Sequence, residues 1–180
     1  MPELQTAVFG GGCFWCLEAV FERVTGVKSV ESGYMGGRRP TPTYEQVCTG
    51  ATGHAEVVRV TFDPSQVSYR DLLDIFFAIH DPTTLNRQGA DAGTQYRSVI
   101  FYLDDDQRRQ AEQAMVELNR AHAYPDPVVT AVEPASEFYM AEDYHQQYYA
   151  QHRSAPYCQY VIAPKLKKFE QKFASNAGTP

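Results

Sequence analysis

The chain has 180 residues, 43% of them hydrophobic, so it is long enough to bury a sizeable core as one compact domain. Its net charge of −6 argues against the basic face of a nucleic-acid-binding protein, and no apolar run approaches the roughly 18 residues that a membrane span needs. Four cysteines are too few for a disulfide framework at this length, and the N-terminus carries no signal pattern. We expect a cytoplasmic monomer that binds neither nucleic acid nor membranes.

Strands and helices are predicted to alternate along the first two thirds of the chain. In chain order we expect a strand, a helix, two strands, a helix and a further strand, at residues 6–9, 14–24, 27–34, 54–62, 68–79 and 96–103. Capping boxes begin at Thr43, which opens a brief helical turn, and at Ser68. A third helix around residues 111–118 and a last core strand at residues 128–132 follow.

The order of these elements suits a two-layer α+β sandwich of the ferredoxin-like (split βαβ) kind. We expect a single domain over residues 1–180. Within it, residues 134–180 are predicted to form a largely irregular C-terminal extension that wraps the core, with a tyrosine-rich helix and a basic terminal segment.

Cys13 follows three glycines and lies at or just before the start of the first predicted helix. A free thiol is only a few per cent ionised at pH 7, but a helix N-terminus favours the thiolate through its unpaired N–H groups and partial positive charge. Cys13 is therefore either an activated nucleophile or a small buried cysteine beside a flexible turn. Cys16 completes a Cys-x-x-Cys spacing that suits a redox disulfide or half of a zinc site. The sequence offers no second ligand pair at zinc spacing, so we expect no metal.

Glu56 shares one face of its predicted strand with Val58, Val60 and Phe62, because side chains alternate with period two. A carboxyl group among apolar side chains has a raised pKa, so it keeps its proton near neutral pH and acts as an acid. The alternative is an ordinary surface carboxylate at the wet end of the strand. Both readings stay open from the spacing alone.

Three further polar residues are ambiguous from the sequence. Tyr44 lies in the capped turn, Asp91 in a glycine-flanked loop, and Tyr96 at the start of a strand on the face of Ser98 and Ile100. Tyrosines in such places more often pack than react. The residues by themselves indicate a cysteine-dependent enzyme and leave its substrate open.

Seven short motifs lie in order between about residue 7 and residue 162: Gly12–Trp15, Ser32–Gly37, Thr43–Tyr44, Gly53–Glu56, His80–Thr84, Gly93–Ser98 and Glu142–Gln146. Each is weak alone, but the ordered set is specific, and it resembles the A-type methionine sulfoxide reductases. This enzyme class reverses the oxidation of methionine to its sulfoxide.

The resemblance implies a thiol-dependent reduction of methionine S-sulfoxide, free or in proteins, and the repair of oxidised proteins. It implies that Cys13 attacks the sulfoxide sulfur and becomes a sulfenic acid. Glu56 would protonate the sulfoxide oxygen, while Tyr44 and Tyr96 donate hydrogen bonds around it. A sulfoxide is a poor electrophile until its oxygen is protonated, so the chemistry needs both an anionic sulfur and a neutral acid. We expect the helix start to supply the Cys13 thiolate and the apolar strand face to supply the protonated Glu56.

The resemblance also implies a pocket and a second thiol. Phe14 and Trp15 would hold the methyl group of the substrate, and Asp91 would order the hydrogen bonds of the pocket. The sulfenic acid is then resolved by another cysteine, and thioredoxin opens the resulting disulfide without a bound cofactor. Cys158 is the candidate that we favour, because family members often carry a recycling cysteine in the C-terminal part. Cys16 is the alternative, or a relay, because members with a Cys-Phe-Trp-Cys motif use that position.

Two functions from other classes fit parts of this pattern. A module that only binds methionine-rich or oxidised peptides would not require Cys13 together with Glu56. A general disulfide oxidoreductase built on Cys13 and Cys16 would not require Glu56. The intact set therefore favours sulfoxide reduction.

Overall fold

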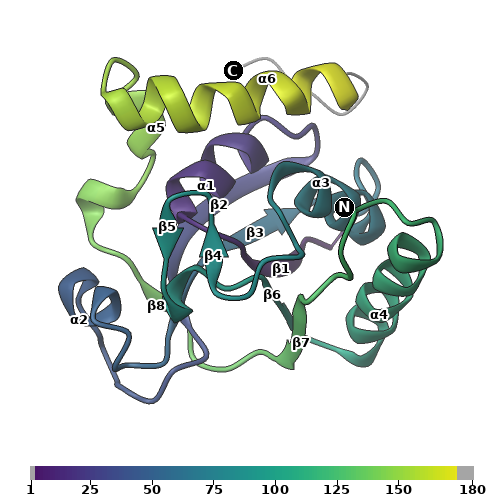
Figure 1. Ribbon diagram of the computed structural model, residues 1–180, viewed down its shortest axis with the longest axis horizontal. Helices are drawn as coiled ribbons and strands as arrows, with labels where there is room; N and C mark the ends of the chain where they lie inside the picture. The colour runs from purple at the N-terminus through teal and green to yellow at the C-terminus, as the bar shows by residue number, and fades with distance from the viewer. Residues whose placement is uncertain (1–2, 174–180) are drawn as a thin grey trace.

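The computed structural model describes residues 3–173 and has one central six-stranded sheet (Figure 1). Its strands are β1 (Gln5–Gly10), β2 (Val27–Met35), β3 (Ala55–Phe62), β6 (Val99–Tyr102), β7 (Ala131–Pro134) and β8 (Tyr139–Met140). They lie in the order β7–β6–β1–β3–β2–β8, and all neighbours are antiparallel except β6 and β7. The sheet is therefore mixed. A separate hairpin pairs β4 (Arg87–Gln88) with β5 (Asp91–Ala92).

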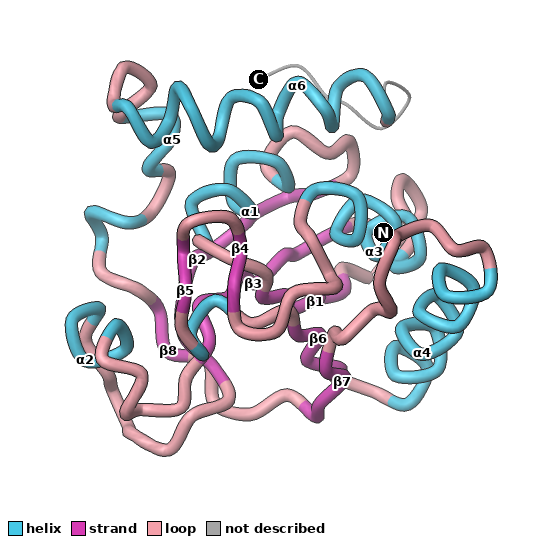
Figure 2. The backbone as a smooth tube through the Cα atoms, viewed as in Figure 1, coloured by secondary structure: helices cyan, strands magenta, loops and turns pink. Residues whose placement is uncertain are grey.

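The helices are α1 (Phe14–Phe21), α2 (Tyr44–Cys48), α3 (Tyr69–Ile79), α4 (Asp105–Arg120), α5 (Tyr148–Gln151) and α6 (Ala163–Lys172). Shorter turns are the 3₁₀ segments η1 (Thr94–Tyr96) and η2 (Asp143–His145) and the π-helical segment η3 (Cys158–Ile162). Helix α6 packs across α1 and α3 (Figures 1 and 2). The capping boxes predicted at Thr43 and Ser68 are confirmed at the starts of α2 and α3. None of the described helices is long and apolar enough to cross a membrane.

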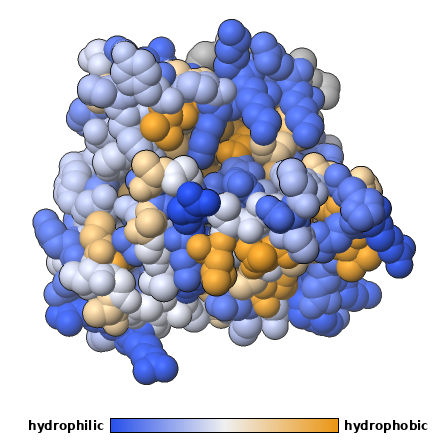
Figure 3. Space-filling model, viewed as in Figure 1, coloured by the Kyte–Doolittle hydropathy of each residue, from blue (hydrophilic) through white to orange (hydrophobic). Residues whose placement is uncertain are grey.

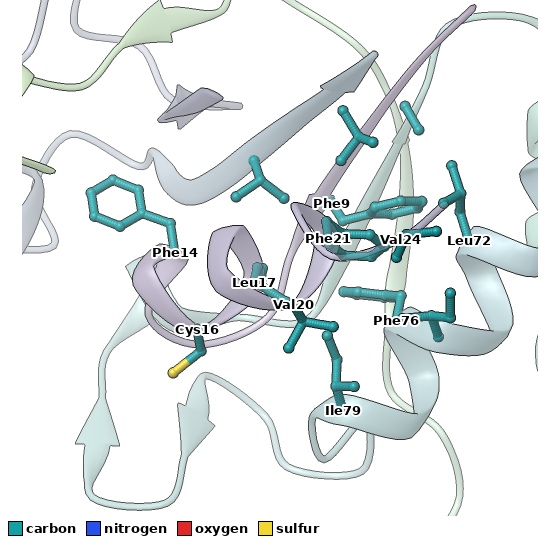
Figure 4. Packing of buried hydrophobic residues seen from close by; sticks show 14 of the residues in the cluster. Phe9, Phe14, Cys16, Leu17, Val20, Phe21, Val24, Leu72, Phe76 and Ile79 are labelled. Atoms are coloured by element: carbon teal, nitrogen blue, oxygen red, sulfur yellow. The ribbon is translucent and has the colours of Figure 1, made fainter. Parts of the chain in front are cut away.

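The larger core lies between the sheet and helices α1 and α3 (Figure 4). At its centre Phe9 of β1 stacks against Phe21 of α1 and Phe76 of α3, with ring centroids 5.4 and 5.0 Å apart. Val58 and Phe62 of β3 are fully buried in the same cluster, as the period-two pattern predicts. This packing fixes α1, and with it the cysteines of its first turn, against the sheet.

Two strands begin later than predicted. Tyr96 ends the turn η1 rather than opening a strand, because its carbonyl oxygen accepts a hydrogen bond from Gly12 in the glycine-rich turn instead of from a sheet neighbour (3.1 Å). The last core strand begins at Ala131 rather than at residue 128. The N–H of Val129 donates to the carbonyl oxygen of Pro82 in a loop, so this part of the chain is held outside the sheet (2.8 Å).

The C-terminal extension is more regular than predicted. Residues 134–173 include β8, α5, η3 and the ten-residue helix α6. Leu166 and Phe169 of α6 are buried in the larger core, which explains why this helix is ordered on the protein surface. The remainder of the predicted extension, residues 174–180, lies outside the described residues.

Candidate active site

The glycine-rich turn after β1 delivers Cys13 to the start of α1. Cys13 is the N-cap residue, with an extended backbone (φ −66°, ψ 129°) and a side chain that is 7% exposed. Gly12 has φ 86°, a conformation that favours glycine, and its N–H donates to the carbonyl oxygen of Tyr96. A Cβ on Gly11 would lie 2.8 Å from the ring of His80. The turn is therefore closely held, and so is the thiol that follows it.

Glu56 of β3 is fully buried beside this turn. Its Oε1 accepts a hydrogen bond from the backbone N–H of Phe14 at 3.2 Å, while its Oε2 is buried without a partner among the described residues. Burial raises the pKa of Glu56 to about 8, although the Phe14 N–H opposes the shift. The carboxyl group is therefore protonated at pH 7, as its apolar strand face predicts, and one of its oxygens is free to meet a ligand.

The thiol of Cys13 differs from the sequence prediction. Burial raises its pKa well above the ordinary value, and negative charge on Glu56 or Cys16 raises it further. A hydrogen bond from the backbone of Trp15 lowers the pKa but does not offset the burial. The prediction of a thiolate in the resting site is thus wrong. The loss of water around the sulfur outweighs the favourable field of the helix start.

Aromatic side chains surround the carboxyl group of Glu56. The fully buried ring of Phe14 stacks against Tyr44, with centroids 6.4 Å apart. Burial raises the pKa values of the Tyr44 and Tyr96 hydroxyls, and the proximity of Glu56 raises them further. Both hydroxyls keep their protons and can donate hydrogen bonds toward the acid. The structure therefore brings these predicted residues together.

Residues 139–148, which we call the strap, bind across β2, α1 and α2. The strap pairs with β2 through β8. The carboxylate of Glu142 accepts hydrogen bonds from the hydroxyl of Tyr34 at 2.9 Å and from the backbone N–H of Tyr44 at 3.0 Å. One strap side chain thus ties the helix that carries Tyr44 to the sheet.

The strap also fixes Trp15. The indole N–H of Trp15 donates to Nδ1 of His145 at 3.0 Å, and its ring stacks on Tyr148 with centroids 3.7 Å apart. Buried Glu18 of α1 accepts hydrogen bonds from the hydroxyl of Ser32 and from the backbone of Tyr148, which holds this end of the strap. The predicted methyl-binding wall therefore depends on the strap for its shape.

The second thiol lies on another side of the first turn of α1. Figure 4 shows Phe14 and Cys16 leaving this turn in different directions. The hydroxyl of Tyr157 lies 3.8 Å from Sγ of Cys16 and donates to Oδ2 of Asp91 at 2.8 Å. Asp91 belongs to the β4–β5 hairpin rather than to an open loop. Cys158, the next residue after Tyr157, is fully buried, and all four cysteines are free.

A cavity of about 730 Å³ reaches Cys13 from the side of α6. It lies between the β4–β5 hairpin, the loop after α3, the segment before β7 and helix α6, where Figure 3 shows a hollow below α6. Its lining includes Cys13, His80, Gln88, Asp91, Tyr124, Tyr157, Lys165 and Lys168. Within residues 3–173, no group of three or more histidine, cysteine or acidic side chains is arranged to hold a metal ion.

Three residues of the site were not predicted as such: Glu142, His145 and Tyr157. The first two lie in the motif Glu142–Gln146, which counted only toward the resemblance. Tyr157 lies beside Cys158, outside the seven motifs. The motif itself was the available signal for Glu142 and His145, because it contains titratable side chains and no predicted strand or helix accounted for it.

Comparison with known proteins agrees with this geometry. Residues 5–177 match the family described as peptide methionine sulfoxide reductase. The chain is 60% identical to peptide methionine sulfoxide reductase MsrA of Polynucleobacter asymbioticus, over 97% of this chain and 92% of that protein. Among solved structures, reduced Mxr1 of Saccharomyces cerevisiae has a TM-score of 0.79 and 34% identity, covering 87% of this chain and 90% of that one. Methionine sulfoxide reductase A of Corynebacterium diphtheriae has a TM-score of 0.75 and 37% identity, covering 86% and 78%. The chain therefore belongs to the A-type peptide methionine sulfoxide reductases, which are oxidoreductases.

Proposed function

We propose that Cys13 and Glu56 together reduce methionine S-sulfoxide, free or in proteins, to methionine. The observation that carries this proposal is a fully buried carboxyl group with a pKa of about 8 beside the cysteine at the start of α1. Its Oε2 has no partner among the described residues, so a sulfoxide oxygen can accept its proton. The sulfoxide is a poor electrophile, so its reduction requires an acid that is still protonated at pH 7.

The raised pKa of Cys13 leads us to propose that the thiol loses its proton only when substrate is bound. Glu56 first donates its proton to the sulfoxide oxygen, which makes the sulfur electrophilic. The carboxylate left behind takes the thiol proton as Sγ of Cys13 bonds to the substrate sulfur. The sulfur–oxygen bond of the substrate then breaks, the hydroxyl group passes to Cys13 as a sulfenic acid, and methionine leaves. Glu56 ends the cycle protonated, so protons and electrons balance.

We propose that the aromatic residues position the substrate. Tyr44 and Tyr96 keep their protons and donate hydrogen bonds to the sulfoxide oxygen, in keeping with their raised pKa values. The rings of Phe14 and Trp15 hold the methyl group, and Asp91 orders the hydrogen bonds at the edge of the site. When the oxygen and the methyl group of the chiral sulfur are both held in place, only one epimer can direct its sulfur toward Cys13. This supports selectivity for the S form.

A second thiol then attacks the sulfenic acid and releases water. We propose Cys158 or Cys16 for this step, since both are free. Cys16 lies in the first turn of α1, and Cys158 lies in η3, which contacts α1. A thioredoxin is the proposed reductant of the resulting disulfide, with no bound cofactor. Yeast Mxr1 has been solved in complex with Trx2. We keep repair of oxidised proteins, a cytoplasmic location and a monomeric state as part of the same proposal.

The fold supports a finer description as well. Strands β6, β1, β3 and β2 are neighbours in that order, and the chain connects them as β1–α1–β2–β3–α3–β6. We propose that this part is a ferredoxin-like (split βαβ) unit, to which β7, β8 and α6 are added. The whole chain is then one domain whose C-terminal part completes the active site.

The proposed function is tested by supplying methionine sulfoxide, free or in a peptide, with dithiothreitol and measuring methionine by mass spectrometry. The wild type should consume the S epimer, Cys13→Ser should be inactive, and Glu56→Gln should lose about 100-fold or more of kcat/KM. The thiol of Glu56→Gln should still react with an alkylating agent. Peptide binding without turnover would instead support a binding module. Reduction of insulin disulfides that survives Glu56→Gln would support a general disulfide oxidoreductase.

A further inference from the structure

The hydroxyl of Tyr157 bridges the second thiol and a carboxylate. It donates its only hydrogen to Oδ2 of Asp91 at 2.8 Å, and its oxygen lies 3.8 Å from Sγ of Cys16. Because the hydroxyl hydrogen is directed to Asp91, the oxygen accepts a hydrogen bond from the thiol. The three groups therefore form a chain from the Cys16 thiol through Tyr157 to the Asp91 carboxylate.

We propose that this chain is a proton relay that ionises Cys16 for attack on the Cys13 sulfenic acid, with Asp91 as the proton acceptor through Tyr157. The inference rests on the proposed function, because it concerns the step after methionine has left. It makes Cys16 the first resolving thiol. Cys158 then acts later, by exchange with the disulfide between Cys13 and Cys16.

The Cys16 thiol keeps its proton in the resting site, so its attack on the sulfenic acid needs a proton acceptor. Burial raises the pKa of Cys16, and the charge of Lys165 on α6 opposes this shift without offsetting it. Lys165 and Tyr157 line the same cavity, which also reaches Cys13. The pKa of Tyr157 is itself raised, by burial first and then by the nearby thiols, so its hydroxyl stays protonated. It therefore gives its own proton to Asp91 while it accepts the proton of the Cys16 thiol. A relay of this kind needs no tyrosinate.

Cys158 has no comparable support. It is fully buried in η3, its thiol makes no hydrogen bond to another described residue, and burial raises the pKa of that thiol. Cys16 is three residues from Cys13 on the first turn of α1, and its backbone N–H donates to the carbonyl oxygen of Cys13 at 3.1 Å. A Cys-x-x-Cys pair at a helix start can close a disulfide without moving another segment.

The step balances as follows. The thiol proton of Cys16 moves to the oxygen of Tyr157, whose own proton moves to Asp91. Sγ of Cys16 bonds to Sγ of Cys13, and the sulfur–oxygen bond of the sulfenic acid breaks. The departing hydroxide takes the proton of Glu56 and leaves as water. Each sulfur ends in the disulfide oxidation state. Asp91 then releases its proton to solvent and Glu56 takes one up, so both groups return to their resting forms.

The relay is tested in a Cys158→Ser background, which leaves Cys16 as the candidate resolving thiol. One equivalent of methionine sulfoxide is mixed with the enzyme, and rapid quenching follows both methionine release and the loss of free thiols. Tyr157→Phe keeps the ring but removes the relay oxygen, and Asp91→Asn removes the proton acceptor. Each should lower the rate of disulfide formation relative to methionine release by about 100-fold at pH 7. The deficit should shrink as pH rises, because solvent hydroxide replaces the relay.

Tyr160→Phe is the matched control, because this neighbouring tyrosine is 78% exposed and lies outside the site. It should leave both rates unchanged. Disulfide formation at the wild-type relative rate and pH dependence in Tyr157→Phe and Asp91→Asn would overturn the relay. A first disulfide between Cys13 and Cys158 in the otherwise wild-type enzyme, found by mass mapping, would also overturn it. Absence of any methionine release would instead contradict the proposed function, so the two failures are distinguishable.

Discussion

Burial of Glu56 has an energetic consequence for the folded protein as well as a chemical one. In the unfolded chain a glutamate has its ordinary pKa of about 4.3, whereas in the folded protein the pKa is about 8. The folded state therefore binds this proton more tightly than the unfolded state. The stabilisation is fully present below the unfolded pKa and is lost as pH rises through the folded pKa. At neutral pH the site thus keeps its acid at the expense of stability.

We predict that Glu56→Gln is almost inactive yet more stable than the wild type at alkaline pH. Glutamine resembles the protonated carboxyl group and still accepts the Phe14 N–H bond, but it has no proton to lose. The free energy of unfolding at pH 8 should rise by about 3–5 kcal/mol, and the gain should vanish below about pH 4. Urea unfolding at several pH values measures this difference. A gain that is equal at pH 4 and pH 8 would mean that Glu56 does not titrate as described.

The strap acts at the scale of the element. Strap residue Glu142 meets two donors, the hydroxyl of Tyr34 and the backbone N–H of Tyr44. Partial burial opposes ionisation of this carboxyl group, but these hydrogen bonds hold its pKa below the ordinary value. The strap is thus bound to α2 through a carboxylate, and the position of Tyr44 depends on it.

We predict that Glu142→Gln loosens α2 and impairs substrate binding. The amide offers one acceptor and one donor where two acceptors are needed, so one donor of the site loses its partner. The free energy of unfolding should fall by about 1–3 kcal/mol. KM for methionine sulfoxide should rise more than kcat falls. Glu137→Gln, an exposed substitution just before the strap, is the control and should change neither quantity. Wild-type KM and stability in Glu142→Gln would contradict this role.

Sequence patterns predicted the elements that follow local rules and missed those set by distant contacts. The capped starts of α2 and α3 depend on residues three apart, and both were predicted. The strap binds β2, α1 and α2 from about 100 residues away, and such pairings leave no periodicity in either segment. The prediction of a low pKa for the Cys13 thiol was wrong for a related reason. A helix start is visible in the sequence, whereas the burial that raises the pKa depends on the whole fold.

At the scale of the whole molecule, α6 is part of the core rather than an appendage. Its Phe169 is fully buried and belongs to the same cluster as Phe9 and Phe76 at the centre of the fold. The sequence predicted a basic terminal segment here but not its packing, because the apolar positions Leu166 and Phe169 form a narrow stripe among lysines. The succession of strands and helices along the first hundred residues was more predictable, because hydrophobic periodicity is a local signal.

We predict that Phe169→Ala destabilises the entire chain. Removing this buried ring should lower the free energy of unfolding by about 3–5 kcal/mol. Fluorescence of Trp15, the single tryptophan, and far-UV circular dichroism should both report one unfolding transition. The two signals should share a midpoint in each protein, and that midpoint should be lower in the variant than in the wild type. Lys167→Ala, on an exposed position of α6, should shift neither signal appreciably. Separate transitions for the two signals would contradict a single cooperative domain.

The central claim is that Glu56 holds a proton at neutral pH and gives it to the substrate oxygen. Titration of the Glu56 carboxyl carbon by NMR tests it most directly, with selectively labelled glutamate and Glu56→Gln to assign the signal. We predict a protonated carboxyl group at pH 7, a midpoint near pH 8, and a fall of kcat/KM across the same range. A carboxyl group that is already ionised at pH 6, both alone and with a bound sulfoxide, would contradict the account.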